Sequence, residues 1–244
     1  MSDSLSQLTS QPAKIAWGPK AAIGVSLVAY FASQIVLAIP IMLLALFSHP
    51  DVQTTIGDSS WLQLVLAGIS AATILLVLGL FLRYRKQGFA SLGFKKIRLS
   101  DIGWMSLAAV VYIIVLVIVM SVAANIPGFN AEQAQDVGYQ GANGWQLVLA
   151  FIGLVILPPL AEEMLFRGFL YRGLSAKWPR VIAALFTSAL FALVHFQWNV
   201  GVDVFILSLI LIALYEKTKN LWMCVGLHAL KNGVAFLALF IFIS

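Results

Sequence analysis

Residues 160–168 read Leu-Ala-Glu-Glu-Met-Leu-Phe-Arg-Gly, which places two adjacent acids and an arginine inside a long apolar run. An acidic side chain at the centre of a membrane helix costs roughly 2.5 to 3.5 kcal/mol on insertion scales. The stretch therefore contains either a structural ion pair or a functional carboxylate. The rest of the chain has to distinguish these two interpretations.

The composition predicts a membrane protein. The chain has 244 residues, of which 61% are hydrophobic and 10% are charged, far from the usage of soluble domains. We predict an all-α fold, a polytopic transmembrane helical bundle. The single cysteine, Cys224, excludes an internal disulfide and a thiolate zinc site. The net charge is +5, but the basic residues stand beside apolar runs, so we expect a lipid bilayer as partner and no nucleic acid.

The apolar runs predict about seven spans, since a helix needs about 20 residues to cross the bilayer. The runs are 21–47, 61–82, 102–123, 145–171, 181–196, 202–215 and 221–243. A break at Pro40 in the first run would raise the number to eight. We divide the chain into a cytosolic tail (1–20), N-terminal spans and loops (21–144) and core spans that carry the polar motifs (145–244).

Lysine and arginine alternate between the predicted connections. The segments 48–60, 124–144 and 197–201 contain neither residue, whereas the connections after the second, fourth and sixth spans are basic. Because cytoplasmic loops carry the excess of positive charge, we predict the N-terminus inside and the C-terminus outside.

Two prolines, Pro158 and Pro159, precede the acids of the opening stretch. Proline lacks an N–H and disfavours helix in the preceding residue, so we predict a break here and a new helix N-terminus, whose partial positive charge stabilises carboxylates. At 100° per residue, Arg167 lies about 40° from Glu163 but about 140° from Glu162. We therefore expect Glu163 to pair with Arg167 and Glu162 to point elsewhere.

Three further polar side chains lie in late spans. His195 belongs to a face of small residues that favours close helix packing, and His228 and Asn232 share a face of the last span. Each alone is typical of an ordinary hydrogen-bonded core residue. Near the inner half of the bilayer, together with Glu162, they would supply a base for water and donors for an oxyanion. Lys231 is interpreted as a partner of one of these acids or as a snorkelling side chain.

The polar residues form three motifs in order on successive late spans. They are Glu162-Glu163-x-x-x-Arg167, Phe191-x-x-x-His195 and His228-x-x-x-Asn232. This pattern resembles the CAAX protease and bacteriocin-processing (CPBP, or Abi) family of intramembrane endopeptidases, which includes the type II CAAX prenyl proteases. The resemblance covers roughly residues 145–243, and the first three spans match only in being membrane spans.

The resemblance implies a role for each motif residue. Glu162 would act as general base on a water shared with His195, His228 and Asn232 would stabilise the oxyanion, and the adjacent ion pair would hold the first acid in place. The family is often described as a metalloprotease family, and Glu162, His195 and His228 could form a zinc site with an open water position. Because the chain has no His-Glu-x-x-His helix and a glutamate mechanism uses the same residues, we prefer no metal cofactor, with Zn²⁺ as the alternative.

The expected partner is a membrane peptide or protein, lipidated or not, cleaved at a site that opens towards the cytosol of a prokaryotic plasma membrane. A non-enzymatic bacteriocin-immunity or scaffold member of the same family is an alternative, but the completeness of the three motifs favours the peptidase. A proton-coupled transporter with a Glu–His relay is a second alternative. The sequence lacks the paired half-helix breaks that are typical of such transporters.

Overall fold

The computed structural model describes residues 15–47, 59–130 and 143–242, which form helices and no strand. The α-helices are α2 (Pro19–Phe47), α4 (Ser60–Tyr84), α5 (Leu99–Ala123), α6 (Trp145–Phe151), α7 (Leu157–Glu163), α8 (Arg172–Ser175), α9 (Arg180–Leu193), α10 (Trp198–Thr218) and α11 (Leu221–Leu237). A 3₁₀ turn, η2 (Phe89–Leu92), and the π-helical segments η3 (Ile152–Ile156), η4 (Met164–Tyr171) and η5 (Ala238–Phe242) complete the described elements.

The predicted membrane bundle is confirmed. In the described part of the chain, six helices are long and apolar enough to cross a bilayer, and α9 is a shorter apolar helix, which gives about seven. Helix α2 runs without interruption from Pro19 to Phe47, so the break at Pro40 that would have added an eighth span is absent.

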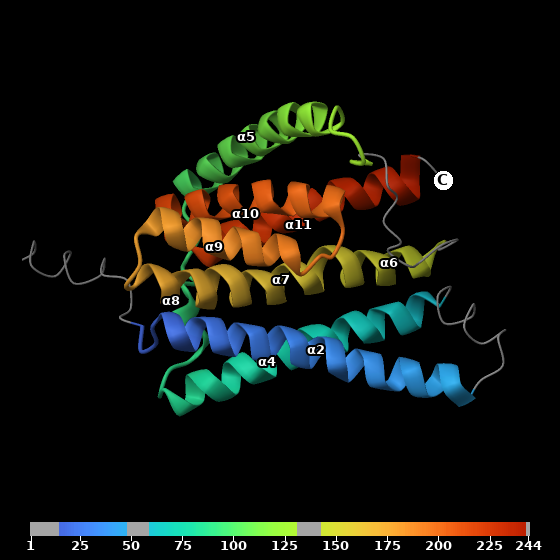
Figure 1. Ribbon diagram of the computed structural model, residues 1–244, viewed down its shortest axis with the longest axis horizontal. Coiled ribbons are helices and arrows are strands. Elements are labelled where there is room, and N and C mark those ends of the chain that lie inside the picture. Colours follow the sequence, from blue (N-terminus) through green and yellow to red (C-terminus); the bar gives the residue numbers. More distant parts are fainter. Residues whose placement is uncertain (1–14, 48–58, 131–142, 243–244) are drawn as a thin grey trace, which may run out of the picture.

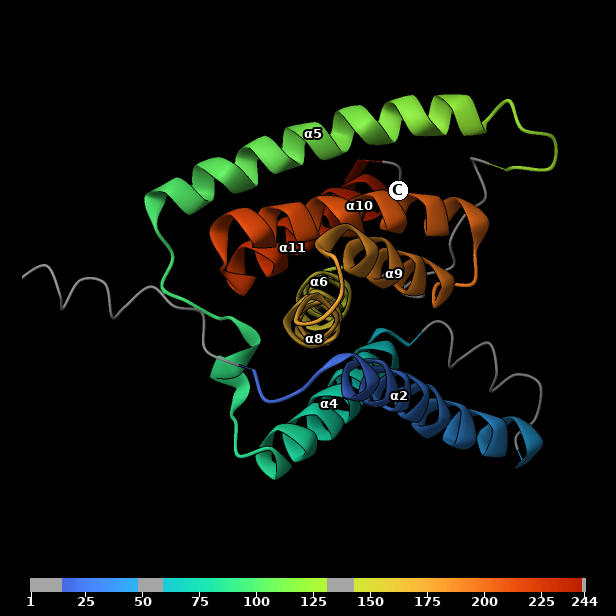
Figure 2. The same cartoon turned by 60° about the vertical axis from the view of Figure 1, so that its left-hand side comes forward.

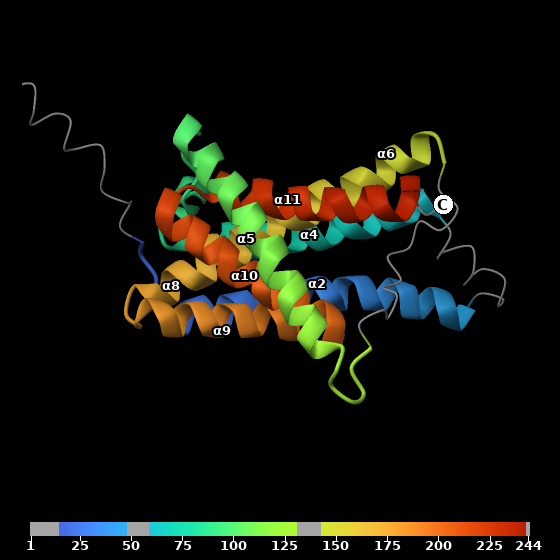
Figure 3. The same ribbon diagram turned by 90° about the horizontal axis from the view of Figure 1, so that it is seen from above.

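The continuous helical segment from α6 to α8 passes through the middle of the bundle (Figure 1). Viewed nearly end-on, it has α2 and α4 on one side and α9, α10 and α11 on the other (Figure 2). Helix α5 lies outermost, contacts α10 and α11, and crosses α10 obliquely (Figure 3). The acids of the opening stretch therefore lie on the central helix, within reach of both flanking groups.

The predicted break at Pro158 is wrong, because the backbone stays helical from Trp145 to Ser175. The helix widens to π geometry in η3 just before the prolines, returns to α geometry in α7 and widens again in η4. In a regular α-helix the proline ring clashes with the carbonyl four residues earlier, and a π turn displaces that carbonyl. Glu162 and Glu163 consequently lie inside a continuous helix, so no helix N-terminus stabilises their charge.

Helix α9 ends at Leu193, three residues before the predicted end of its span. Phe196 has a φ of 53°, a left-handed conformation that a right-handed helix cannot include. With 14 residues, α9 is about 21 Å long, less than the roughly 30 Å of the hydrocarbon core. His195 therefore lies on the turn between α9 and α10 rather than on a helix.

Candidate active site

Glu163 is the buried acid of the pair. Its Oε1 lies 2.8 Å from Nη1 of Arg167, and both side chains are fully buried, so the predicted ion pair is present. The guanidinium carbon of Arg167 lies 4.4 Å from the centre of the Phe191 ring. Oε1 also lies 2.8 Å from Nδ1 of His228. These partners compensate a carboxylate that would otherwise be costly to bury.

The contact with Glu163 places a hydrogen on one nitrogen of the His228 ring. A carboxylate only accepts, so Nδ1 of His228 carries the hydrogen that it donates to Oε1. The second ring nitrogen, Nε2, then faces Glu162, whose Oε2 is 3.9 Å away. This distance is too long for a direct hydrogen bond and suits a bridging group such as water.

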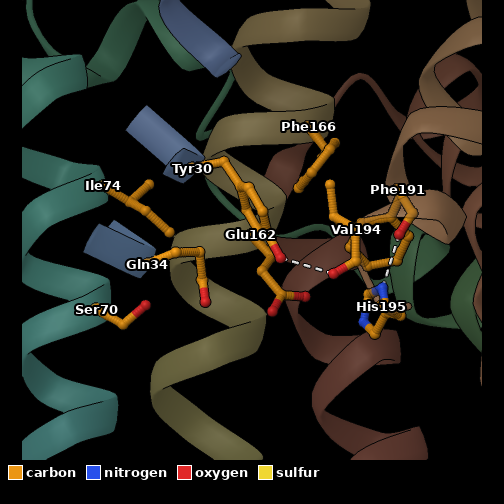
Figure 4. Close-up of a pocket in the computed structure, with 9 residues that line it drawn as sticks. All are labelled: Tyr30, Gln34, Ser70, Ile74, Glu162, Phe166, Phe191, Val194 and His195. Carbon is orange, nitrogen blue, oxygen red and sulfur yellow. Dashed lines mark hydrogen bonds between the residues drawn. The ribbon is translucent and has the colours of Figure 1, made fainter. Parts of the chain in front are cut away.

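Glu162 points away from the buried ion pair, as the helical geometry predicts. Its side chain is 27% exposed and lines a cavity of about 270 Å³ between the N-terminal helices and the core (Figure 4). The residues that line the cavity are Tyr30 and Gln34 of α2, Ser70 and Ile74 of α4, Glu162 of α7, Phe166 of η4, Phe191 of α9, and Val194 and His195 of the following turn. The two adjacent acids thus have different environments.

His195 lines the same cavity from the turn that follows α9 (Figure 4). Its Nδ1 lies 2.7 Å from the Phe191 carbonyl oxygen, and because a carbonyl only accepts, Nδ1 carries the hydrogen and Nε2 is left for the cavity. The carbonyl of Val194, in the turn itself, accepts a hydrogen bond of 2.6 Å from the Tyr30 hydroxyl. These bonds give both carbonyls a hydrogen-bond donor, which lipid cannot supply. They also fix the position of the imidazole.

The other two predicted site residues, His228 and Asn232, belong to α11 and do not line the cavity. His228 contacts Glu163 directly and approaches Glu162. Asn232 donates its Nδ2–H to the carbonyl oxygen of Leu154 at 2.9 Å. The structure therefore places Glu162 and His195 on one cavity, His228 beside both acids, and Asn232 against η3.

Residues 144–234 match the sequence model of the type II CAAX prenyl endopeptidase Rce1-like family. This segment, which is less than half of the chain, is similar to that family. It runs from the residue before α6 into α11 and contains all three motifs, whereas α2, α4 and α5 lie outside it. No curated protein and no solved structure matches the chain. The chain is thus an integral membrane protein whose core is similar to a family of endopeptidases.

The cavity is shared between the Rce1-like segment and the N-terminal helices. Tyr30, Gln34 and Ser70 supply polar atoms to its wall from α2 and α4. Sequence reasoning missed all three, because isolated polar residues within apolar spans carry no motif. Their presence in otherwise apolar runs was the one available signal.

Lys231 of the Rce1-like segment does not pair with the motif acids as expected. Its Nζ lies 2.9 Å from Oδ2 of Asp203 in α10, and Asp203 also accepts a hydrogen bond from the Tyr112 hydroxyl of α5. Sequence reasoning missed Asp203, although a carboxylate near the start of an apolar run was a visible signal. The lysine charge is therefore compensated by Asp203, and the interpretation of Lys231 as a partner of Glu162 or Glu163 is wrong.

The alternative zinc set consists of Glu162, His195 and His228. In residues 15–47, 59–130 and 143–242, no three His, Cys, Asp or Glu side chains gather in a group that could hold a metal ion. The residues as arranged do not fit a metal, so the chemistry below uses only groups of the chain.

Proposed function

We propose that the chain is an intramembrane endopeptidase that hydrolyses a peptide bond of a membrane-anchored substrate, with Glu162 as general base. The observation that carries this proposal is the difference between the environments of the two adjacent acids. Glu163 is fully buried by Arg167 and His228, whereas Glu162 reaches a cavity that His195 also lines. The similarity of residues 144–234 to an endopeptidase family supports the same reaction.

The proposed reaction begins with a water held between Glu162 and His195. Glu162 removes a proton from the water, and the oxygen attacks the carbonyl carbon of the scissile bond to give a tetrahedral oxyanion. When protonated, Nε2 of His228 donates to that oxyanion, and the second N–H of Asn232 is the further donor that the resemblance implies. Collapse of the intermediate breaks the C–N bond, and the proton held by Glu162 passes to the leaving amine.

His195→Ala is expected to lower the cleavage rate by about 100-fold, since losing the position of the attacking water can cost this much. The rate would be measured with purified protein in liposomes that contain lipidated and unlipidated membrane peptides. Phe196→Ala is the matched control, because Phe196 is the next residue of the same turn and is 82% exposed. Equal rates for His195→Ala and the wild type would show that His195 takes no part in the mechanism.

We further propose that the basic connections face the cytosol of a prokaryotic plasma membrane and that the cavity opens towards that side. The start of α2 and the connections α4–α5, α8–α9 and α10–α11 lie at one end of the bundle (Figure 1). Cys224 is buried, so a membrane-impermeant maleimide would react with a cysteine introduced at the exposed Lys95. We expect the Lys95→Cys variant to be labelled only after the cells are permeabilised. Labelling of intact cells would show that the orientation is the opposite one.

A further inference from the structure

The two prolines before the acids leave one backbone carbonyl without a backbone donor, whether the helix has the α or the π pattern of hydrogen bonds. In an α-helix the N–H of residue 158 would donate to the Leu154 carbonyl, and in a π-helix the N–H of residue 159 would do so. Both positions are proline, which has no N–H. The N–H of Leu157 donates to the Ile152 carbonyl instead. The Leu154 carbonyl therefore needs a donor from outside its own helix.

Asn232 supplies that donor from α11. Its Nδ2 lies 2.9 Å from the Leu154 oxygen, and α11 contacts η3 along this stretch. Within a bundle surrounded by lipid, an unpaired carbonyl destabilises the fold because no water replaces the missing donor. The bond also joins α11, which carries His228, to the helix that carries Glu162 and Glu163.

We propose that Asn232 is a positioning residue. It supplies the hydrogen bond that Pro158 and Pro159 cannot donate, and thereby fixes the helix of the catalytic acid relative to His228. The amide uses one N–H for Leu154 and retains the other. This bond sets the register of α7, which follows directly after η3 and begins five residues before Glu162. The role in activity rests on the proposed function, whereas the role in stability does not.

The test is a double-mutant cycle between the amide and the prolines. Asn232→Ala is expected to lower the midpoint of thermal unfolding in detergent by about 4 °C and the cleavage rate at least about tenfold. In a Pro158→Ala, Pro159→Ala background, backbone N–H groups become available to Leu154. There, the further decrease of the midpoint caused by Asn232→Ala should be less than half as large.

Asn125→Ala is the matched control, because its Nδ2 donates to the Ser121 carbonyl at 2.8 Å in an exposed position; it should shift the midpoint little in both backgrounds. If the double proline variant does not accumulate, Pro158→Ala alone makes the same comparison, since residue 158 is the α-helical donor to Leu154. An equal decrease of the midpoint in both backgrounds would overturn the proposal. A loss of cleavage with an unchanged midpoint would also overturn it, because Asn232 would then act only on the reacting atoms.

The measurements separate this inference from the proposed function. If no membrane peptide is cleaved by the wild type, the endopeptidase proposal fails, but the midpoints still decide whether Asn232 compensates the prolines. If the wild type cleaves and the midpoints show no coupling between Asn232 and the prolines, the endopeptidase proposal stands and this inference fails.

Discussion

Glu162→Gln is expected to abolish peptide cleavage, with a decrease in kcat of about 1,000-fold. Glutamine keeps the shape of the side chain but cannot accept a proton from water. Glu162 is partly exposed to the cavity, and Nε2 of His228 is 3.9 Å away from its carboxylate, so the unfolding midpoint should change little. The rate and the midpoint would be measured on the same purified preparation in liposomes and in detergent, respectively.

Glu216→Gln provides the matched control for this substitution. Glu216 is a partly exposed acid whose carboxylate pairs with Arg180 and Lys219 near the end of α10, away from the cavity. The same chemical change there should leave cleavage unaffected. Undiminished cleavage by a pure Glu162→Gln preparation would rule out Glu162 as the general base.

Arg167→Met is expected to produce the largest loss of stability. It leaves the carboxylate of Glu163 fully buried with His228 as its remaining partner, and removing one member of a buried ion pair costs about 3 to 5 kcal/mol. The free energy of unfolding in detergent would measure this loss. Cleavage should also fall, because Glu163 orients the His228 ring.

Arg180→Met gives the comparison for an exposed pair. Its side chain is 74% exposed and its Nη1 lies 3.2 Å from Oε2 of Glu216, so the loss of this pair should cost less than about 1 kcal/mol. If the two arginine variants were equally stable, the Glu163–Arg167 pair would not support the structure of the site.

Local periodicity predicted much of the bundle and part of the site. The apolar runs predicted the helices, and the spacing of four residues predicted that Glu163, and not Glu162, pairs with Arg167. These features depend on residues that are close in sequence, so one helical wheel suffices to derive them. The family resemblance added the order of the motifs, which the match of residues 144–234 supports.

The features that the sequence did not predict depend on contacts between distant segments. The helix continues through Pro158 and Pro159, where Asn232, 78 residues from Leu154 in the chain, binds a carbonyl that the prolines leave without a donor. His195 lies on a turn whose Val194 carbonyl is bound by Tyr30, 164 residues away. A one-dimensional pattern contains no information about which distant side chain will supply these donors.

The most direct test of the central claim is cleavage in water enriched in heavy oxygen. The purified wild-type protein, in liposomes with lipidated and unlipidated membrane peptides and an excess of a zinc chelator, would be compared with Glu162→Gln by mass spectrometry of the products. We expect the wild type to release a peptide whose new carboxylate carries one heavy oxygen, and Glu162→Gln to release none. Product from both proteins, or from neither, would contradict hydrolysis by a Glu162-activated water without a metal.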